Sequence, residues 1–580
     1  MRKFICGKIS ELLRFMVYLL LPITGGGWMG VSCSDLIETD SELVEFQKDN
    51  RLQSPSDTVY SVMGIVYKMQ AIADRTVLLG ELRGDLVSAT ASATTDLKAI
   101  ANFEVDTDNA YNRISDYYAI INNCNYFLTY VNKDLVRHDR TVFEHEYAAV
   151  KAFRAWTYLQ LAQIYGSVPL VTEPLLSEEA SQVAMQQPPQ DIKAICKYFI
   201  DDLKPYADTK LPTYGTIDYK DSKKFFIPVR ALLGDLCLWA GRYSEAAQYY
   251  HDYLSQRTAP IRTNTSSARW ADANTRNFMN INNTLSYDID DTDCLTLIPM
   301  ESGEFYGVKS QLYDIFNSTD LNQQYAKVKP TKRMYQLSAK YNYCYKEIDS
   351  KGGVDTLYAE RENLTDSMYV GDLRFSSVYE HRITGEDRYS RISNETQRIR
   401  KYYSSSAGVT LYRANMVYLR YAEALNRARC PQSAFAVLKY GLYRDIVSTM
   451  IDDVERTAAA ALITFDPIYF SVDNTQGVHA RGCGDADCDT TYCMPMPKTA
   501  LATRQDTIDY QIPEVEDMII DEMALEGAFE GYRYYDLMRV ALRRDDASYL
   551  ADPVSRRQGN VDTELKTKLM NQKNWYLPKP

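Results

Sequence analysis

The segment from Phe226 to Leu254, FIPVRALLGDLCLWAGRYSEAAQYYHDYL, constrains the fold more than any other part of the sequence. Two apolar, alanine-containing runs with helical spacing are separated here by a short Gly-Arg connection. Gly234 and Ala246 allow two helices to approach closely, and Gly241 permits the left-handed backbone of a tight turn. Ser244 is suited to cap the second helix. The segment therefore predicts a helical hairpin.

The spacing within this segment is that of a tetratricopeptide helix pair. The matching positions are Leu233, Gly234, Gly241, Tyr243, Ala246 and Tyr250. One such pair cannot bury its apolar face alone, so further helices are expected elsewhere. Apolar periodicity places them at residues 54–75, 117–131, 146–165, 417–428 and 434–443. The predicted fold is mainly α, with tetratricopeptide-like hairpins forming a scaffold.

Long stretches rich in Tyr, Asn, Asp and Thr separate the predicted helices, at residues 255–293, 340–410 and 465–515. Their turn residues and short apolar runs predict irregular loops with a few short strands. Loops of this length are uncommon unless they have a role. Because no linker interrupts the chain after its first residues, we expect residues 33–580 to form a single domain.

The first 32 residues have the features of an export signal. A basic start is followed by a short apolar run from Phe15 to Ile23, which is too short to span a membrane. The sequence Gly30-Val31-Ser32-Cys33 resembles the lipobox of bacterial lipoproteins, in which the cysteine is acylated and becomes the new N-terminus. We therefore expect residues 1–32 to be removed as a lipoprotein signal peptide and Cys33 to carry the lipid anchor.

Composition excludes some classes of function. The chain of 580 residues carries a formal net charge of −12, and such a surface repels nucleic acid. The motifs HExxH, GxSxG and GxxxxGK[ST] do not occur, and the 5 histidines are scattered. The 46 tyrosines suit packing between helices or stacking on ligands. Paired carboxylates for glycoside cleavage remain open, because their spacing is set in three dimensions.

The cysteines divide into two groups. Those in helix-like segments are expected to be small buried hydrophobic residues, namely Cys124, Cys196, Cys237 and Cys430. Three others, Cys483, Cys488 and Cys493, share one polar loop with His479 just upstream. The alternatives for this loop are a disulfide between two of the three sulfurs, unpaired thiols, or a zinc site with a looser ligand spacing than structural zinc sites have.

The same loop holds Asp485, Asp487 and Asp489, which alternate as the first ligands of a calcium loop do. Thr490 and Met496, however, stand where that motif requires Gly and a bidentate Glu. These three aspartates are thus candidates for a calcium site, and otherwise no cofactor or metal is expected.

Four segments together resemble the SusD/RagB family of surface lipoproteins. They are Tyr147–Leu170, YAAVKAFRAWTYLQLAQIYGSVPL; Leu419–Ala424, LRYAEA; Glu522–Arg539, EMALEGAFEGYRYYDLMR; and the closing Asn574–Pro578, NWYLP. The resemblance covers essentially the whole chain after residue 32. It implies a SusD-like fold and a lipid-anchored protein exposed at the cell outer membrane. It also implies a non-catalytic role, in which an oligosaccharide or peptide nutrient is delivered to a SusC-like TonB-dependent transporter.

The residues themselves suggest where a ligand binds. Trp270 lies in a polar stretch where no helical stripe accounts for a large apolar ring, and Tyr306 is flanked by Gly303 and Gly307. Aromatic rings of this kind stack on sugar rings. Arg83 and Asp85 follow an early helix and are candidate hydrogen-bonding partners for the ligand.

Within the Glu522–Arg539 segment, Arg533, Asp536 and Arg539 fall on a short helix with Glu526 and Glu530 nearby, which favours a structural ion-pair network over catalysis. A surface-anchored glycan-degrading enzyme and a structural scaffold are the alternative functions.

Overall fold

The structure is a computed structural model. It describes residues 55–137, 140–261, 269–272, 277–279, 293–303, 305–316, 326–348, 351–352, 354–358, 371–384, 394–402 and 408–579. All of these residues belong to one unit, Arg51–Pro580. The predicted signal peptide and Cys33 lie outside the described residues, so the expected boundary at residue 33 stays a prediction.

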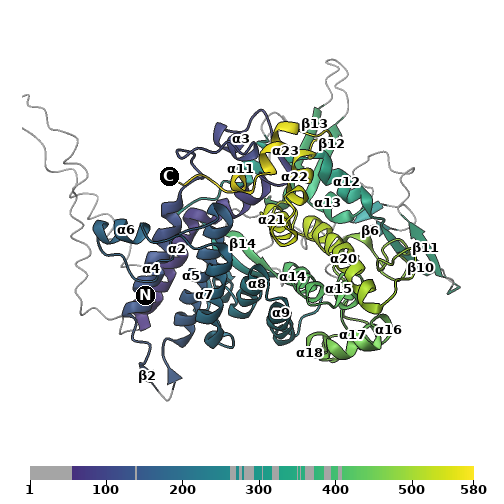
Figure 1. Cartoon of the computed structure of the whole chain (residues 1–580), viewed down its shortest axis with the longest axis horizontal. Helices are drawn as coiled ribbons and strands as arrows, with labels where there is room; N and C mark the ends of the chain where they lie inside the picture. Colours follow the sequence, from purple (N-terminus) through teal and green to yellow (C-terminus); the bar gives the residue numbers. More distant parts are fainter. Residues whose placement is uncertain are drawn as a thin grey trace, which may run out of the picture. The chain divides into compact units, whose positions relative to one another are not determined.

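A row of packed helices forms the scaffold. Its members are α2 (Pro55–Glu81), α4 (Ile114–Tyr130), α5 (Glu144–Tyr165), α7 (Ile192–Leu203), α8 (Val229–Ala240), α9 (Tyr243–Arg257), α14 (Ala414–Arg427), α15 (Pro431–Lys439) and α20 (Arg504–Glu526). Each helix from α2 to α15 packs against the next one in this row, and α20 packs against both α14 and α15 (Figure 1). Helix α9 thus adjoins α14 although more than 150 residues separate them in the sequence.

The α8–α9 pair confirms the predicted helical hairpin. A Cβ atom on Gly234 would lie 2.4 Å from Cε1 of Tyr250, so the close approach of the two helices requires glycine there. Gly241 ends α8 with φ of 78°, in the left-handed region. The expected cap is wrong: α9 begins at Tyr243 after Arg242, whose side chain makes no capping bond, and Ser244 lies inside the helix.

Further helices connect and cover this row. They are α3 (Thr95–Ala101), α6 (Glu178–Met185), α11 (Leu312–Phe316), α12 (Lys332–Lys340), α13 (Leu373–Val378), α16 (Arg444–Met450), α17 (Asp453–Ala458), α18 (Ala460–Ile463), α19 (Ala480–Cys483), α21 (Arg533–Arg544), α22 (Ser548–Ser555) and α23 (Thr563–Leu569). Single 3₁₀ turns occur at Lys204–Tyr206, Ser222–Phe225, Arg400–Tyr402 and Gln572–Trp575. No helix in the described parts of the chain has both the length and the apolar character needed to cross a membrane.

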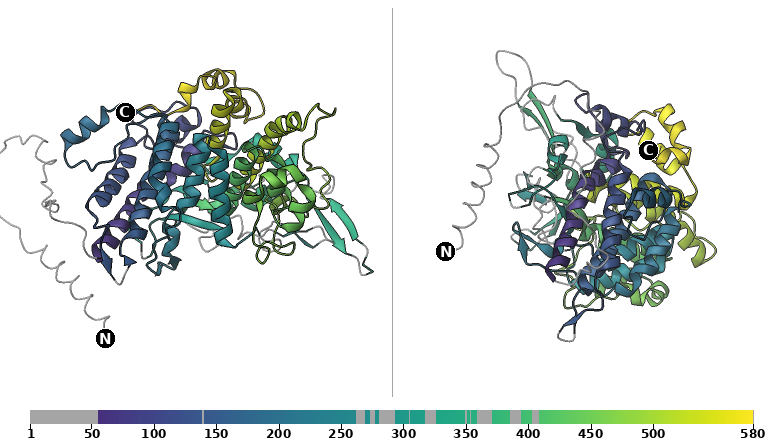
Figure 2. Two further views of the ribbon diagram at one scale, coloured as in Figure 1. Left: turned by 60° about the horizontal axis from the view of Figure 1, so that its bottom comes forward. Right: turned by 90° about the vertical axis from the view of Figure 1, so that its left-hand side faces the viewer.

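The described strands form antiparallel pairs and no larger sheet. The pairs are β1 (Val87–Ala89) with β9 (Val328–Pro330), β2 (Val136–Arg137) with β3 (Arg140–Thr141), β4 (Thr216–Ile217) with β5 (Lys220–Asp221), β6 (Arg269–Asp272) with β7 (Asn277–Met279), β8 (Cys294–Pro299) with β14 (Gly408–Arg413), β10 (Cys344–Ile348) with β11 (Val354–Tyr358), and β12 (Tyr379–Thr384) with β13 (Asn394–Ile399). The left view of Figure 2 shows the β10–β11 hairpin projecting beyond the helices. Strand β14 is buried along its whole length.

Most of the predicted loops contain such strands, but one prediction is wrong. Residues 504–515, expected to be irregular, form the first half of α20. Thr503 and Asp506 make reciprocal hydrogen bonds that cap the helix at its start. Pro513 lies inside this helix, and its lack of an N–H group does not end the helix. The apolar face of α20 packs on α14 and α15, which stabilises a segment whose local sequence resembles a loop.

The C-terminal residues close the core. Trp575 is fully buried, and its Nε1 donates to the carbonyl of Leu569 at 2.6 Å. The backbone N–H of Leu577 donates to the carbonyl of Ile164 at the end of α5. The closing segment that resembles the family thus holds the first helices against the last ones.

Candidate functional site

The structure separates the predicted ligand-binding residues. Tyr306 is 76% exposed. Trp270 lies in β6 opposite Phe278 of β7, and its side chain is outside the described residues. Exposure of Tyr306 agrees with a stacking role, whereas the role of Trp270 stays a prediction.

Arg83 and Asp85 are corrected by the structure, because both are buried and bound to protein groups. The Arg83 guanidinium donates to the carbonyl of Trp575 at 2.9 Å and to the hydroxyl of Tyr535 at 3.0 Å. Asp85 accepts two hydrogen bonds from Arg533. These side chains hold the N-terminal and C-terminal helices together and are not exposed to solvent.

Tyr306 stands on a turn that follows β8. In this turn the N–H of Glu301 donates to the carbonyl of Val308 at 2.9 Å, and the N–H of Ser302 donates to the carbonyl of Phe305 at 2.8 Å. Phe305 is buried beneath the turn, with its ring centroid 5.1 Å from that of Tyr67 on α2. The neighbouring rings of Phe305 and Tyr306 therefore have opposite roles: one anchors the turn and the other faces solvent.

Gln70 of α2 fixes the backbone of this turn. Its amide nitrogen donates to the carbonyl of Pro299 at 2.7 Å, and its amide oxygen accepts from the N–H of Val308 at 3.0 Å. Gly307 has φ of 130°, and a Cβ atom there would lie 2.0 Å from the Gln70 amide oxygen. Glycine is thus required beside Tyr306, which explains one of the two glycines noted in the sequence.

A second exposed tyrosine, Tyr219, stands on the neighbouring β4–β5 turn and is 87% exposed. Asp218 and Tyr219 have φ values of 50° and 63°, as in a two-residue hairpin turn. The buried Asp218 carboxylate accepts hydrogen bonds from Ser302 of the first turn and from Lys220 Nζ, the latter at 2.9 Å. The two turns are therefore joined below their exposed rings.

We call Tyr67, Tyr219 and Tyr306 the tyrosine surface. All three rings are more than a third exposed, and they belong to elements joined through Phe305 and the Asp218–Ser302 contact. Such rings present an apolar face and a polar hydroxyl on a backbone that is already fixed. Sequence reasoning missed Tyr219, because the polar stretch around it has no feature that separates an exposed tyrosine from a packed one.

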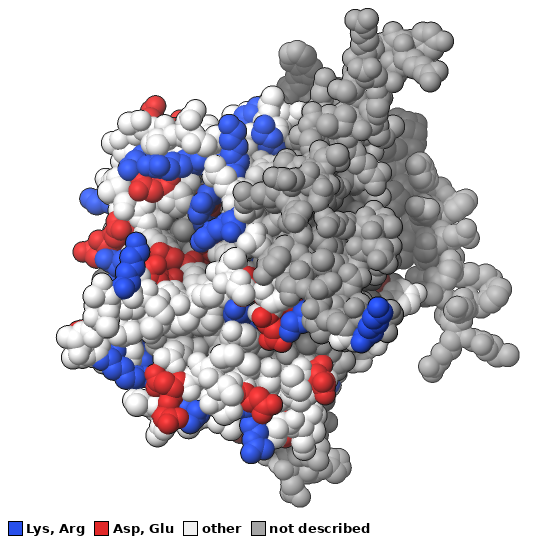
Figure 3. All heavy atoms as spheres, turned by 90° about the vertical axis from the view of Figure 1, so that its right-hand side faces the viewer, with Lys and Arg blue, Asp and Glu red and all other residues white. Residues whose placement is uncertain are grey.

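Charged side chains of both signs are interspersed on the described part of the face that Figure 3 shows. Several exposed acids and bases are paired, among them Arg504 with Asp452 at 2.9 Å and Lys346 with Asp487 at 3.1 Å. The described part of that face has no extended basic surface of the kind that binds nucleic acid.

Arg533, Asp536 and Arg539 form buried ion pairs, as predicted, but Glu526 and Glu530 are not their partners. Arg533 pairs with Asp85, whereas Glu526 and Glu530 both pair with Arg413. Arg539 donates to both oxygens of Glu423 on α14, at 3.0 and 2.6 Å. Burial alone would raise the pKa of Glu423, but Arg539 and Arg543 lower it to about 2. The network joins α14 to α21 and has the structural role that the sequence predicts.

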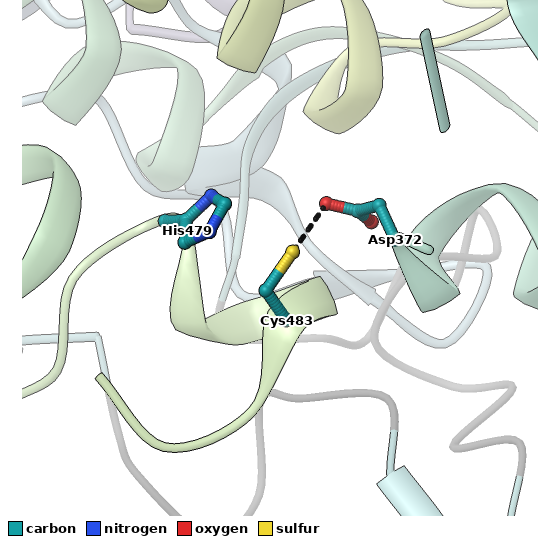
Figure 4. Close-up of side chains that lie close together, drawn as sticks. All are labelled: Asp372, His479 and Cys483. Carbon is teal, nitrogen blue, oxygen red and sulfur yellow. Dashed lines mark hydrogen bonds between the residues drawn. The ribbon is translucent and has the colours of Figure 1, made fainter. Parts of the chain in front are cut away.

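Three side chains lie close enough to share a metal ion, namely Asp372, His479 and Cys483, and all three are buried (Figure 4). Their ligand atoms already have protein partners. Arg374 donates to both oxygens of Asp372, and His479 Nδ1 lies 2.6 Å from a Glu522 oxygen. Cys483 Sγ donates to Asp372 at 3.3 Å.

The charges around this group account for its burial without a metal ion. Burial and the Asp372 charge raise the pKa of the Cys483 thiol well above its ordinary value. Burial alone would lower the pKa of His479, but Glu522 and Asp489 raise it. The Asp372 carboxylate accepts hydrogen bonds from both the Cys483 thiol and the Arg374 guanidinium, as in a structural network.

The calcium candidates do not share one site. Asp485 accepts from the N–H of Lys346 at 2.8 Å, and Asp487 pairs with the Lys346 ammonium. Asp489 is buried against His479. The group with metal-ligand spacing among the described residues does not include these three aspartates. The calcium interpretation is therefore wrong for this arrangement of the loop.

The loop cysteines also separate. Cys493 is exposed, Cys483 faces Asp372, and Cys488 lies beside Cys344 of β10. A disulfide within the loop is thus contradicted, and all three are thiols in this structure. Cys124, Cys196, Cys237 and Cys430 are buried, as their helical positions predict.

Comparison with known proteins places the fold. No family model and no curated protein matches the chain. Among solved structures, a SusD superfamily protein from Bacteroides vulgatus superposes with a TM-score of 0.59 at 13% identity, covering 91% of this chain and 96% of that one. A SusD-like carbohydrate-binding protein from Bacteroides fragilis gives 0.53 at 16% identity, covering 85% and 87%. A laminarin-binding SusD-like protein gives 0.52 at 15%, covering 91% and 96%.

The helix row and the interleaved loops thus define a mainly α protein built on a tetratricopeptide-like scaffold. More particularly, the chain has the SusD-like fold, as the four sequence segments predict.

Proposed function

We propose that this chain is a SusD/RagB-type protein that binds a glycan on the tyrosine surface and does not cleave it. The observation that carries the proposal is the pair of exposed rings, Tyr219 and Tyr306, on turns joined by the Asp218–Ser302 hydrogen bond. The SusD-like fold supports it, because structural neighbours of this chain include proteins described as carbohydrate-binding and laminarin-binding.

The chemistry of the surface suits a sugar. The apolar faces of sugar rings stack on exposed aromatic rings, and tyrosine hydroxyls bond to sugar hydroxyls. Binding loses less free energy to ordering when the protein side is fixed beforehand. Gln70 and Asp218 provide that rigidity, because they bind the backbone and side chains of both turns from below.

The direct test measures affinity by calorimetry for a panel of oligosaccharides that includes laminarin fragments, with peptides as a second panel. Loss of one stacked ring should weaken binding by roughly fivefold to tenfold, about 1 kcal/mol. We expect this loss for Tyr306→Ala and for Tyr219→Ala, measured against the glycan that binds best.

The control is Tyr510→Ala, which removes a tyrosine that is 37% exposed on α20 and belongs to neither turn. Its affinity should equal that of the unchanged protein. Binding of peptides but of no glycan, or equal affinity in a Tyr219→Ala, Tyr306→Ala double variant, would contradict the proposal.

The absence of cleavage is part of the proposal. Asp218, the buried acid below the rings, is engaged by Lys220 and Ser302, which suits a structural role better than proton transfer to a substrate. Incubating the bound glycan with the protein and analysing its chain length separates a binder from an enzyme. Shortened products whose formation scales with protein concentration would favour the enzyme alternative.

The proposed location is the outer surface of the outer membrane, with the lipid on Cys33 as the anchor and a SusC-like TonB-dependent transporter as the partner. The lipobox-like sequence and the resemblance to SusD/RagB proteins support this part. An anchored protein has no route across the membrane, so the captured glycan must pass to a transporter. Detergent extraction and affinity capture should recover a large β-barrel protein; repeated recovery of the chain alone would argue against the partnership.

A further inference from the structure

Cys344 and Cys488 are distant in sequence but belong to one small structural junction. Cys344 begins β10, and its carbonyl accepts a hydrogen bond from the N–H of Asp485 at 2.9 Å. It also forms an isolated parallel bridge with Gly484. The chain then turns back, because the N–H of Cys488 donates to the carbonyl of Asp485 at 3.2 Å. Both cysteines are therefore positioned around the same peptide unit.

The two sulfurs converge on that unit. Cys344 Sγ lies 3.6 Å and Cys488 Sγ lies 3.3 Å from the carbonyl oxygen of Asp485. The thiols are also hydrogen-bonding partners of each other. The two thiols therefore contact the same carbonyl oxygen and each other, which is the proximity that a disulfide between them requires.

A glycine explains how the two backbones come so close. Gly484 has φ of 83°, and a Cβ atom there would lie 1.9 Å from the carbonyl oxygen of Cys344. Lys346 adds two contacts, from its N–H to Asp485 and from its ammonium to Asp487. Backbone hydrogen bonds and Lys346 thus hold the β10–β11 hairpin against the loop after α19, in addition to the contact between the two cysteines.

We propose that Cys344 and Cys488 form a disulfide bond when the chain meets a disulfide-containing oxidant. In this thiol–disulfide exchange each thiol gives up its proton, one S–S bond forms between Cys344 and Cys488, and the S–S bond of the oxidant breaks. The two electrons pass to the oxidant, which leaves as two thiols. Such oxidants are present in the compartments through which exported proteins pass.

The bond would fix the base of the projecting hairpin to the loop. It would also close a large loop of the chain, which restricts the unfolded state. The other cysteines of the loop are not competitors by geometry. Cys483 is buried against Asp372, and Cys493 faces the carbonyl of Thr490 on the exposed side.

The test treats the full chain after residue 32 with oxidised glutathione or with a phosphine reductant, alkylates free thiols and maps peptides without reduction. The oxidised sample should contain the Cys344 and Cys488 peptides joined, lighter than their sum by the mass of two hydrogen atoms. The reduced sample should contain both peptides separately alkylated. Melting should occur at a higher temperature in the oxidised sample.

Two variants complete the test. In Cys488→Ser the linked peptide should disappear and oxidation should no longer raise the melting temperature. In the control, Cys493→Ser, both the linked peptide and the melting shift should remain. The proposal is overturned if Cys344 and Cys488 are alkylated separately after oxidation, or if Cys488 is joined to Cys483 or Cys493. The result does not depend on glycan binding, and only the natural source of the oxidant rests on the proposed export of the chain.

Discussion

The carboxylate of Asp85 accepts two hydrogen bonds from the guanidinium of Arg533, at 2.7 and 2.9 Å, although 448 positions separate the two residues. Both side chains are almost completely buried. Burial alone would raise the pKa of Asp85, but Arg533 holds it below its ordinary value. The pair therefore connects the end of α2 to α21 as a charged pair within the core.

Breaking this pair should destabilise the protein strongly. In Asp85→Asn the guanidinium of Arg533 loses its charged partner while staying buried, and such changes cost about 3–5 kcal/mol. Urea denaturation followed by circular dichroism measures the loss. The control is Arg504→Ala, which breaks the exposed pair with Asp452 and should cost less than about 1 kcal/mol. Similar losses in both variants would contradict a special role for the buried pair.

Because Glu81 is a buried carboxyl group, we expect it to make the stability of the protein depend on pH. Its side chain is fully buried; one oxygen accepts from the N–H of Gly531 at 2.8 Å, and the other has no hydrogen-bond partner among the described residues. Burial raises the pKa of Glu81 from 4.5 to about 8. The folded state binds the Glu81 proton more tightly than the unfolded state does. Protonated Glu81 therefore contributes to the free energy of unfolding in full below pH 4.5, and this contribution is lost as the pH rises to about 8.

Glu81→Gln keeps the accepting oxygen but cannot ionise. As the pH rises within this window, the unchanged protein should lose about 1.4 kcal/mol of unfolding free energy per pH unit relative to the variant. Denaturation curves at pH values near both ends measure the change. Glu564→Gln, on the exposed surface of α23, is the control and should have the same small effect at both values. A constant difference for Glu81→Gln would show that Glu81 is ionised throughout.

Two glycines in the Tyr306 turn make a matched pair. Gly307→Ala places a Cβ atom against Gln70 and forces alanine to a φ of 130°, so the turn has to move. Gly303→Ala meets no atom within 4 Å. We expect Gly307→Ala to weaken glycan affinity by roughly fivefold, as loss of the Tyr306 ring would, and Gly303→Ala to leave it unchanged. Calorimetry measures the glycan affinity of both variants. Equal affinities of Gly307→Ala and Gly303→Ala would mean that the orientation of this turn does not matter for binding.

We expect Cys33 to determine the processing of the precursor and the attachment of the protein to the membrane. Each methylene of an acyl chain buried in the membrane contributes about 0.8 kcal/mol, so multiple chains hold a protein stably. Cys33→Ala should release soluble protein or leave the precursor uncleaved, which fractionation and mass spectrometry distinguish from normal maturation. Cys493→Ser serves as the cysteine control and should not alter the location. Normal processing and membrane attachment of Cys33→Ala would show that the lipobox interpretation is wrong.

The amino-acid sequence by itself determined the features that depend on local spacing. The hairpin from Phe226 to Leu254 was predictable, because residues three and four apart form one helix face and Gly241 marks the turn. The family resemblance gave the fold, because its segments recur in order. Tyr306 was selected because Gly303 and Gly307 flank it, and its side chain is exposed in the structure.

Tertiary structure decided which polar groups are buried and which partners they have. Arg83 and Asp85 look like surface residues in the sequence, but residues near the C-terminus surround them. Tyr219 lies beside the Tyr306 turn because Asp218 contacts Ser302, and Cys488 meets Cys344 instead of its loop neighbours. The physical reason is the same in each case: burial of a polar group is stable only with a partner, and contacts between distant parts of the chain supply that partner.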